Sequence, residues 1–166
     1  LMSEACEYDL PYVAEHCDVF YIGGTKVGAM FGEAVVFSGM KAPKYFFTNV
    51  KRHGALLAKG RMLGIQFDTL FKDELYFKIS KHAINMAAGI RKIFAKHNIP
   101  LAYDSPTNQQ FVILSPTLYQ ALSKLVAFEI WEKKNEQEIV CRFVTSWATK
   151  EEELEELLEC MCLDIK

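Results

Sequence analysis

The stretch DVFYIGGTKVGAMFGEAVVF, residues 18–37, decides the fold, because it sets a single lysine between two apolar runs. Residues 18–22 are β-branched and aromatic, which predicts a short strand buried on both faces. Two glycines interrupt this run, and residues 33–37 predict a second strand. Two strands do not make a stable sheet alone, so the pattern indicates that this pair needs further structure to pack against.

Lys26, in the turn between these strands, has three interpretations. The commonest is a surface lysine whose stem packs on apolar groups while its ammonium stays in water. The second is a phosphate-binding lysine, although the pattern GxxxxGK[ST] does not occur here. The third is a nucleophile, because burial disfavours the ammonium and leaves an amine that can form an imine with an aldehyde. Spacing alone does not choose among them.

The rest of the chain predicts a change of architecture near residue 74. Residues 44–71 have a helical pattern dented by glycine, and 74–97 predict an amphipathic helix. Beyond Pro100 we expect three strands and two helices, the last opened by a capping box of Thr149 and Glu152. We therefore expect two domains, 1–74 and 75–166, the second a small α+β unit. The expected strands are 109–114, 127–132 and 138–147, with a short helix at 116–125.

Composition excludes several classes of protein. The net charge of −2 gives no global attraction to nucleic acid or to an anionic membrane, and we expect neither as a partner. No apolar run approaches the roughly 20 residues needed to cross a bilayer. Five cysteines without framework spacing predict reduced thiols in a cytoplasmic protein, and they lack the spacing of a zinc site.

Three quoted segments together resemble one enzyme family. They are residues 18–37, then KRHGALLAKGRMLGIQF (51–67), and finally TNQQF (107–111) with CRFVTSWAT (141–149). In this order they resemble the low-specificity threonine aldolases, which are lyases dependent on pyridoxal 5′-phosphate (PLP). The resemblance implies an α/β fold: the C-terminal part of the PLP-binding large domain of a fold type I (aspartate-aminotransferase-like) enzyme, followed by a small α+β domain.

The resemblance also implies roles for residues near the lysine. By this likeness Lys26 carries the cofactor as an imine, and Gly24 shapes the turn where a Cβ would obstruct close approach. Thr25 could offer its hydroxyl to the phosphate or could simply pack in the turn. Residues 41–61 hold six Lys and Arg and no acid, which is either a solvated basic face or a phosphate site. The family pattern favours Lys51 as the phosphate ligand, often across a subunit interface.

Arg142 is the second strong candidate. It shares one face of an apolar strand, and an arginine there is costly to bury without a partner. A surface salt bridge is one interpretation. By the resemblance, the matching arginine binds the substrate α-carboxylate, for which a planar guanidinium is well shaped.

The implied activity is cleavage of L-threonine or L-allo-threonine to glycine and an aldehyde, in a homodimer or homotetramer with its active site at the subunit interface. The resemblance begins partway through the family's sequence. The aspartate that pairs with the pyridine nitrogen would lie before Leu1, so we expect the chain by itself to be incomplete. Two alternatives stay open: another PLP-dependent β-eliminating lyase, and a non-catalytic fragment.

Overall fold

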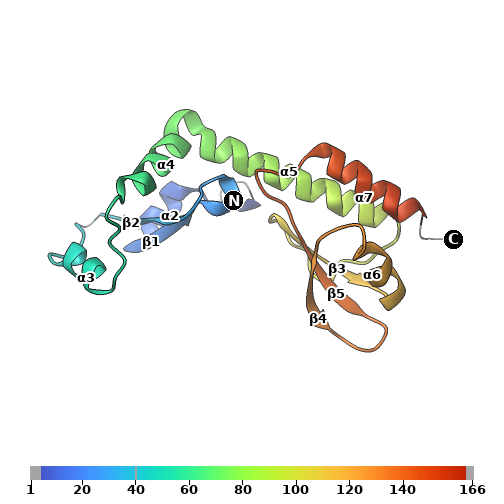
Figure 1. Ribbon diagram of the computed structural model, residues 1–166. Helices are drawn as coiled ribbons and strands as arrows, with labels where there is room; N and C mark the ends of the chain where they lie inside the picture. Colours follow the sequence, from blue (N-terminus) through green and yellow to red (C-terminus); the bar gives the residue numbers. More distant parts are fainter. Residues whose placement is uncertain (1–4, 40, 164–166) are drawn as a thin grey trace.

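The computed structural model describes residues 5–39 and 41–163, so the position expected for the family's aspartate, before Leu1, lies outside it. Figure 1 shows two groups of elements joined by one long helix. The elements in chain order are α2 (Leu10–His16), β1 (Val19–Gly23), the 3₁₀ helix η1 (Thr25–Val27), β2 (Glu33–Phe37), α3 (Phe46–Arg52), α4 (Arg61–Phe71), the 3₁₀ helix η2 (Lys72–Glu74), α5 (Leu75–Lys96), β3 (Gln109–Leu114), α6 (Pro116–Leu122), β4 (Glu129–Lys133), β5 (Ile139–Val144) and α7 (Glu151–Leu163).

The two predicted N-terminal strands form an antiparallel hairpin. Gly23 pairs with Glu33 at the turn, and Val19 pairs with Phe37 at the open end. The expected burial on both faces is wrong, because β1 alternates between exposed and half-buried residues. Tyr21, for example, is 70% exposed. Within the described residues the hairpin is a two-stranded sheet, and Val19, Tyr21 and Val35 on one of its faces are exposed.

The prediction of one helical region over 44–71 is wrong between residues 53 and 60. α3 stops after Arg52 because Gly54 adopts a left-handed conformation with φ of +72°. The amide of Gly54 then donates to the carbonyl of Lys51, and the amide of Ala55 donates to that of Val50, each at 3.0 Å. This pair of bonds is a Schellman motif, which satisfies the last carbonyls of a helix and ends it.

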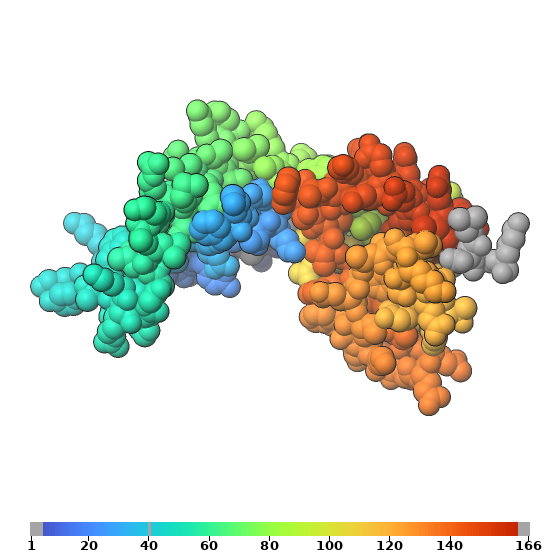
Figure 2. Space-filling model, in the orientation of Figure 1, coloured from blue at the N-terminus to red at the C-terminus, as the bar shows by residue number. Residues whose placement is uncertain are grey.

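Helix α5 connects the two halves of the chain, and the helix predicted over 74–97 is confirmed. Its start is fixed by Asp73 and Glu74, whose φ angles of 51° and 60° break the chain direction after α4. The first half of α5 contacts α4 and η1, and the second half contacts β3 and α7. In Figure 2 the two groups form separate masses joined through this helix, and the surface is hollowed between them. The division into domains at residue 74 stays a prediction.

The C-terminal unit is a three-stranded antiparallel sheet in the order β3-β5-β4, with α5 and α7 packed against it. All three predicted strands are confirmed, although β5 ends at Val144 and the chain then leaves the sheet. β5 is the central strand and is mostly buried. The hydrophobic core contains Ile90, Ile93, Phe94, Val112, Leu114, Leu122, Ile139, Cys141, Phe143, Leu157 and Met161.

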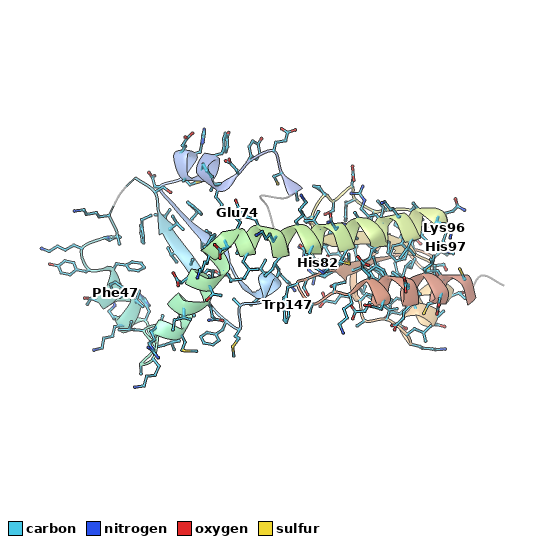
Figure 3. All side chains as sticks on the ribbon, turned by 90° about the horizontal axis from the view of Figure 1, so that it is seen from above. Phe47, Glu74, His82, Lys96, His97 and Trp147 are labelled. Carbon is cyan, nitrogen blue, oxygen red and sulfur yellow. The ribbon has the colours of Figure 1, made fainter. Side chains whose placement is uncertain are left out.

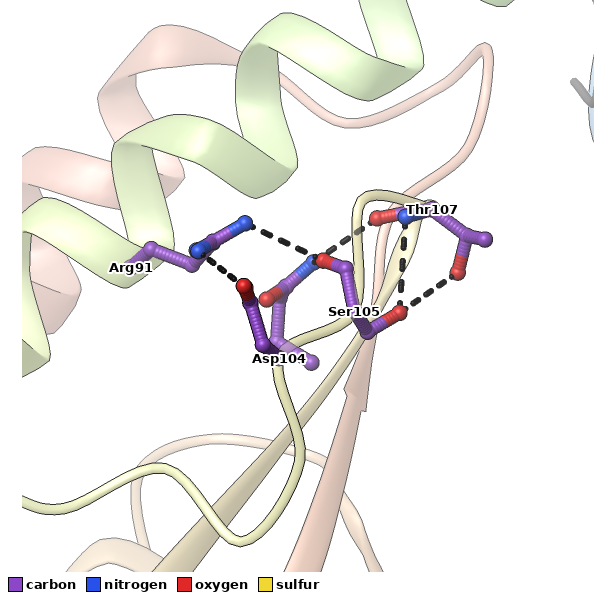
Figure 4. Close-up of polar contacts among 5 residues, drawn as sticks. Arg91, Asp104, Ser105 and Thr107 are labelled. Atoms are coloured by element: carbon purple, nitrogen blue, oxygen red, sulfur yellow. Dashed lines mark hydrogen bonds and ion pairs between the residues drawn. The ribbon is translucent and has the colours of Figure 1, made fainter. Parts of the chain in front are cut away.

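The loop before β3 is tied to α5 by polar contacts, shown in Figure 4. Arg91 of α5 donates to the carboxylate of Asp104 at 2.6 Å and to the carbonyl of Ser105 at 3.2 Å. The hydroxyl of Ser105 in turn bonds that of Thr107 at 2.9 Å. These contacts set where β3 begins relative to α5.

The predicted capping box at the start of α7 is wrong by one residue. The Thr149 hydroxyl accepts from the backbone amide of Ser146 at 3.0 Å, so it faces away from the helix. The side chain of Glu153 instead accepts from the amide of Lys150 at 2.8 Å, which is the reach-back half of a capping box. The helix therefore begins at Glu151, with Lys150 as its N-cap residue.

We predict that Cys141 makes stability depend on alkaline pH. The residue is fully buried in β5, and burial raises the pKa of its thiol from 9.0 to about 11. The unfolded chain therefore releases this proton at lower pH than the folded chain does. Its contribution to the free energy of unfolding is present in full below pH 9 and is lost as the pH rises toward about 11.

Urea unfolding of the wild type and of Cys141→Val at pH 8 and pH 10 measures this effect. We expect the wild type to lose more stability than the variant between the two pH values, whereas Cys17→Ala, at an exposed position, should behave like the wild type. Equal losses in the wild type and Cys141→Val would show that the thiol does not carry the dependence.

Candidate functional site: the lysine turn and the arginine strand

The turn that carries Lys26 is anchored by its neighbour. In η1 the side chain of Val27 points inward and is 1% exposed, packed with Ala29, Leu70 and Tyr76. The side chain of Lys26 is exposed. The turn is closed by the carbonyl of Gly24, which accepts from the amides of Val27 and Ala29 at 3.1 and 2.9 Å. Val27 thus fixes the backbone of the turn, while the residue before it, Lys26, presents its amine.

Gly24 is needed for packing within the chain. It is buried, and a Cβ added there would lie 2.6 Å from the Cβ of Ala29 and 3.0 Å from Cζ of Phe67. The expectation that Gly24 shapes the turn agrees with this geometry, but the close neighbours are protein atoms of the turn itself and of α4. Thr25 is exposed beside Lys26, at the start of η1.

Two hydrogen bonds connect the turn to the rest of the chain. The hydroxyl of Tyr76, in α5, donates to the carbonyl of Gly23 at 2.9 Å. The backbone amide of Trp147, after β5, donates to the carbonyl of Lys26 at 3.1 Å. Figure 3 labels Trp147 beside α5, near His82. The lysine turn is therefore joined to the segment that follows β5.

That segment is held by a buried polar cluster around Thr145. The Thr145 hydroxyl donates to the carbonyl of Ala83 in α5 at 2.7 Å. Its amide donates to the carbonyl of Asn108 at 3.0 Å, and its carbonyl accepts from the Asn108 side chain at 2.7 Å. Arg142 precedes Trp147 by five residues, a length of chain that spans at most about 18 Å. The structure thus places the strand of Arg142 and the backbone of Lys26 in one connected region.

Arg142 is half-buried on the central strand and is held by side chains of both neighbouring strands. Its Nη1 donates to Oε1 of Gln109 on β3 at 3.1 Å, and its Nη2 donates to the carboxylate of Glu129 on β4. Its Cζ lies 5.2 Å from the ring centroid of Trp131, a cation–π distance. From the sequence, one interpretation of Arg142 was a surface salt bridge, and in the structure Arg142 forms an ion pair with Glu129.

Gln109, Glu129 and Trp131 were missed by sequence reasoning. A signal was present, because Glu129 and Trp131 are two residues apart in a predicted strand. The sequence did not show that β4 and β3 would both lie beside β5.

Lys51 lies at the other end of the hairpin from Lys26. α3 packs against the hairpin through Phe46, whose ring centroid is 5.2 Å from that of Phe37. Phe37 pairs with Val19 at the open end, about 13 Å along the strand from the turn. Figure 3 likewise places Phe47 of α3 far from Trp147, the contact of the lysine turn. Within the described chain, α3 does not bring Lys51 to the turn that carries Lys26.

The expected desolvation of Lys26 is also not found. Lys26 and Lys51 are both exposed, so protein atoms of the described chain do not exclude water from either ammonium. Atoms from elsewhere, such as a bound cofactor or another polypeptide, would have to supply that burial. The two groups have the chemistry that PLP and its substrate require. The exposed amine of Lys26 can reach the aldehyde of PLP, and the half-buried guanidinium of Arg142 can bind the carboxylate of an amino acid.

The chain resembles threonine aldolases in both sequence and structure. The chain is 29% identical over 142 residues to the low-specificity L-threonine aldolase of Pseudomonas sp. (strain NCIMB 10558), and 28% identical over 141 residues to that of Pseudomonas aeruginosa. Both matches cover 84% of this chain and 40% of the relative. The solved structure of Leishmania major threonine aldolase matches with a TM-score of 0.90 and 36% identity, over 96% of this chain and 47% of that one.

The resemblance to the threonine aldolases is confirmed. The α/β architecture expected from it, that of a fold type I enzyme, is confirmed by the same structural likeness. The chain spans about 40% of the length of its threonine aldolase relatives from Pseudomonas. No protein-family model matches the chain.

No helix in the described part of the chain is long and apolar enough to cross a membrane. Across 5–39 and 41–163, no group of three or more His, Cys, Asp or Glu side chains is arranged to hold a metal ion.

We predict that Gly24→Ala lowers the free energy of unfolding by about 1–3 kcal/mol, because the added methyl group overpacks a closed turn. Gly23→Ala is the matched control, since no atom lies within 4 Å of the Cβ it would add. Urea unfolding of both variants measures the difference. Equal stability of the two variants would contradict the packing role of Gly24.

We predict that Thr145→Val lowers the free energy of unfolding by about 1 kcal/mol, the usual value of one neutral hydrogen bond. Valine matches the shape of threonine but cannot donate to the carbonyl of Ala83. Thr145→Ser keeps the hydroxyl and is the control for the bond, while it loses the methyl group. If Thr145→Val and the wild type unfold at the same urea concentration, the hydrogen bond from Thr145 to Ala83 does not stabilise this segment.

Proposed function

We propose that this chain carries part of the active site of a PLP-dependent carbon–carbon lyase that cleaves L-threonine or L-allo-threonine to glycine and an aldehyde. The observation that carries the proposal is the connection of Lys26 to the strand of Arg142, through the bond from the Trp147 amide to the Lys26 carbonyl. The amine and the guanidinium are the two groups such a reaction needs from this region. The threonine aldolase relatives support the choice of reaction.

Each residue then has a chemical task. Lys26 provides the amine that holds the aldehyde of PLP, and its rigid turn sets where the cofactor is held. Arg142 binds the α-carboxylate of the substrate, which orients the bond between Cα and Cβ. PLP, when bound, supplies the electron sink that stabilises negative charge at Cα. As the bond between Cα and Cβ breaks, the β-hydroxyl loses its proton and Cβ becomes the aldehyde carbon. The bonding electron pair stays on Cα, which then accepts a proton to give glycine.

We assign the phosphate to Lys51 and to the hydroxyl of Thr25, while Gly24 shapes the turn beside the cofactor. Because Lys51 and Lys26 lie at opposite ends of the hairpin, we propose that Lys51 acts on the cofactor of a second subunit. The assembly would be a homodimer or homotetramer with active sites at the interface. The exposed cations of residues 41–61 suit a dianionic phosphate. We also propose that the chain divides into domains 1–74 and 75–166 and that the protein is cytoplasmic.

Non-catalytic behaviour of this chain alone is the second candidate. It is favoured by the exposure of Lys26, because the described residues do not enclose the amine in a pocket that would hold the cofactor. Another PLP-dependent β-eliminating lyase would use the same lysine and arginine, and the products distinguish it.

The test is to add PLP to the purified chain, reduce with borohydride and map the modified lysine by mass spectrometry. We expect Lys26 to be modified severalfold more than Lys124, an exposed lysine of the C-terminal unit. In Lys26→Arg the preferred site should disappear, because a guanidinium does not form the imine. Even labelling of all exposed lysines would contradict a role of Lys26 in holding PLP.

Product analysis with L-threonine separates the remaining candidates. Glycine and an aldehyde support the lyase proposal, whereas a 2-oxo acid and ammonia support β-elimination. Selective modification of Lys26 without turnover supports the non-catalytic candidate.

A further inference from the structure

The surroundings of Arg142 contain a charge that the proposed reaction does not use. The guanidinium bonds Gln109 on one side, and on the other it forms an ion pair with Glu129. The Glu129 side chain is 68% exposed and that of Arg142 is 26% exposed. A carboxylate of the protein is thus present where a carboxylate of the substrate is expected to bind.

The guanidinium of Arg142 has N–H donors that the described residues do not use. A guanidinium has five N–H donors, one on Nε and two on each terminal nitrogen. One donor of Nη1 is used by Gln109 and one of Nη2 by Glu129. The Nε of Arg142 is buried and has no hydrogen-bond partner among the described residues. Three donors are therefore unpaired in the part of the chain that the structure describes. Apart from the buried Nε they lie one on each terminal nitrogen, so a ligand carboxylate that reaches these two lies beside Glu129.

Trp131 covers the guanidinium. The pairing of β4 with β5 shifts between Ile130 and Glu132, so Trp131 has no partner on β5, as in a β-bulge. Its ring contacts that of Phe111 on β3 edge-on, with centroids 5.2 Å apart. The indole, which Phe111 contacts from the neighbouring strand β3, thus stabilises Arg142 in its orientation toward Glu129.

We propose that Glu129 is a specificity-determining residue, which makes Arg142 selective for amino acids that carry a single carboxylate. This inference rests on the proposed role of Arg142 in binding the α-carboxylate. The α-carboxylate of every amino acid that binds Arg142 lies beside Glu129 and can gain two hydrogen bonds, so its repulsion from Glu129 is common to all these ligands. A second carboxylate on the ligand side chain adds a further repulsion from the negative charge of Glu129. Hydroxyl side chains, such as that of threonine, carry no charge to repel.

The size of the effect follows from Coulomb's law at a solvated site. Two like charges at close range in water-like surroundings disfavour each other by about fivefold in binding. Removing the charge of Glu129 should therefore improve the binding of an acidic amino acid relative to threonine by about this factor. Gln in its place still accepts the bond from Nη2, so the guanidinium stays in position.

The experiment is an NMR titration of the 166-residue chain, following the side-chain N–H signals of Arg142 and the indole N–H of Trp131. The ligands are L-threonine, L-aspartate and L-threoninol, which lacks the carboxylate. In the wild type we expect L-threonine to shift the Arg142 signals at lower concentration than L-aspartate, and L-threoninol to leave them unchanged. In Glu129→Gln the ratio of the two dissociation constants should narrow by about fivefold.

Glu132→Gln is the matched control, because it removes the same charge from the same strand. Glu132 is exposed and accepts a bond from the hydroxyl of Tyr103 at 3.4 Å. We expect this variant to keep the wild-type ratio. An unchanged ratio in Glu129→Gln, or an equal change in both variants, would overturn the inference while leaving carboxylate binding at Arg142 intact.

Failure of the proposed function has a different signature. If L-threonine and L-threoninol act alike on the wild type, and Arg142→Lys binds L-threonine equally well, then Arg142 is not the carboxylate site. The inference about Glu129 is then overturned together with that assignment.

Discussion

The burial of Val27 is the interaction on which the arrangement of this chain depends. A two-stranded hairpin is marginal in water, and in the described residues β1 and β2 pair only with each other. Val27 supplies the missing attachment by inserting between α4 and α5, next to Leu70 and Tyr76. Because Lys26 precedes Val27 in a single 3₁₀ turn, inserting one side chain directs the other outward. The position of the amine is thus a consequence of hydrophobic packing.

Helix α5 connects the lysine turn to the C-terminal unit. Its first half bonds the turn through the hydroxyl of Tyr76, and further along it accepts from Thr145 at the carbonyl of Ala83. Thr145 stands between Arg142 on β5 and Trp147, whose amide bonds Lys26. The lysine turn and the segment after β5 are far apart in sequence, and both are thereby bonded to the same helix, α5. A change in the Thr145 cluster would move the guanidinium and the amine relative to each other.

The environment of these two groups differs, and the difference matters for chemistry. Arg142 is already provided with a partner on each side and an aromatic ring over it, which suits a group that must stay in one orientation. Lys26 is fixed at its backbone only, and its amine is in water. An amine that attacks an aldehyde works best when it is desolvated. The chain therefore supplies placement for both groups, and it partly buries Arg142 but leaves the amine of Lys26 in water.

The sequence by itself determined the strands and the long helix, and it singled out Lys26 and Arg142 as candidate site residues. These follow from local patterns, such as the apolar run before Gly23, the three- and four-residue spacing in α5, and the motif around Arg142. It also indicated a likeness to the threonine aldolases. It overestimated the burial of β1, since a pattern of apolar residues records what a strand can pack against, and not what is present to pack against it.

Only the tertiary structure decided which side chains surround the arginine and where Lys51 lies. Gln109, Glu129 and Arg142 come from three strands, and their meeting depends on the order β3-β5-β4, which no local pattern encodes. The Schellman motif at Gly54 ended α3, and the contact between Phe46 and Phe37 held it at the open end of the hairpin. Local sequence fixes secondary structure because its hydrogen bonds join near neighbours, whereas the pairing of distant segments depends on packing across the whole chain.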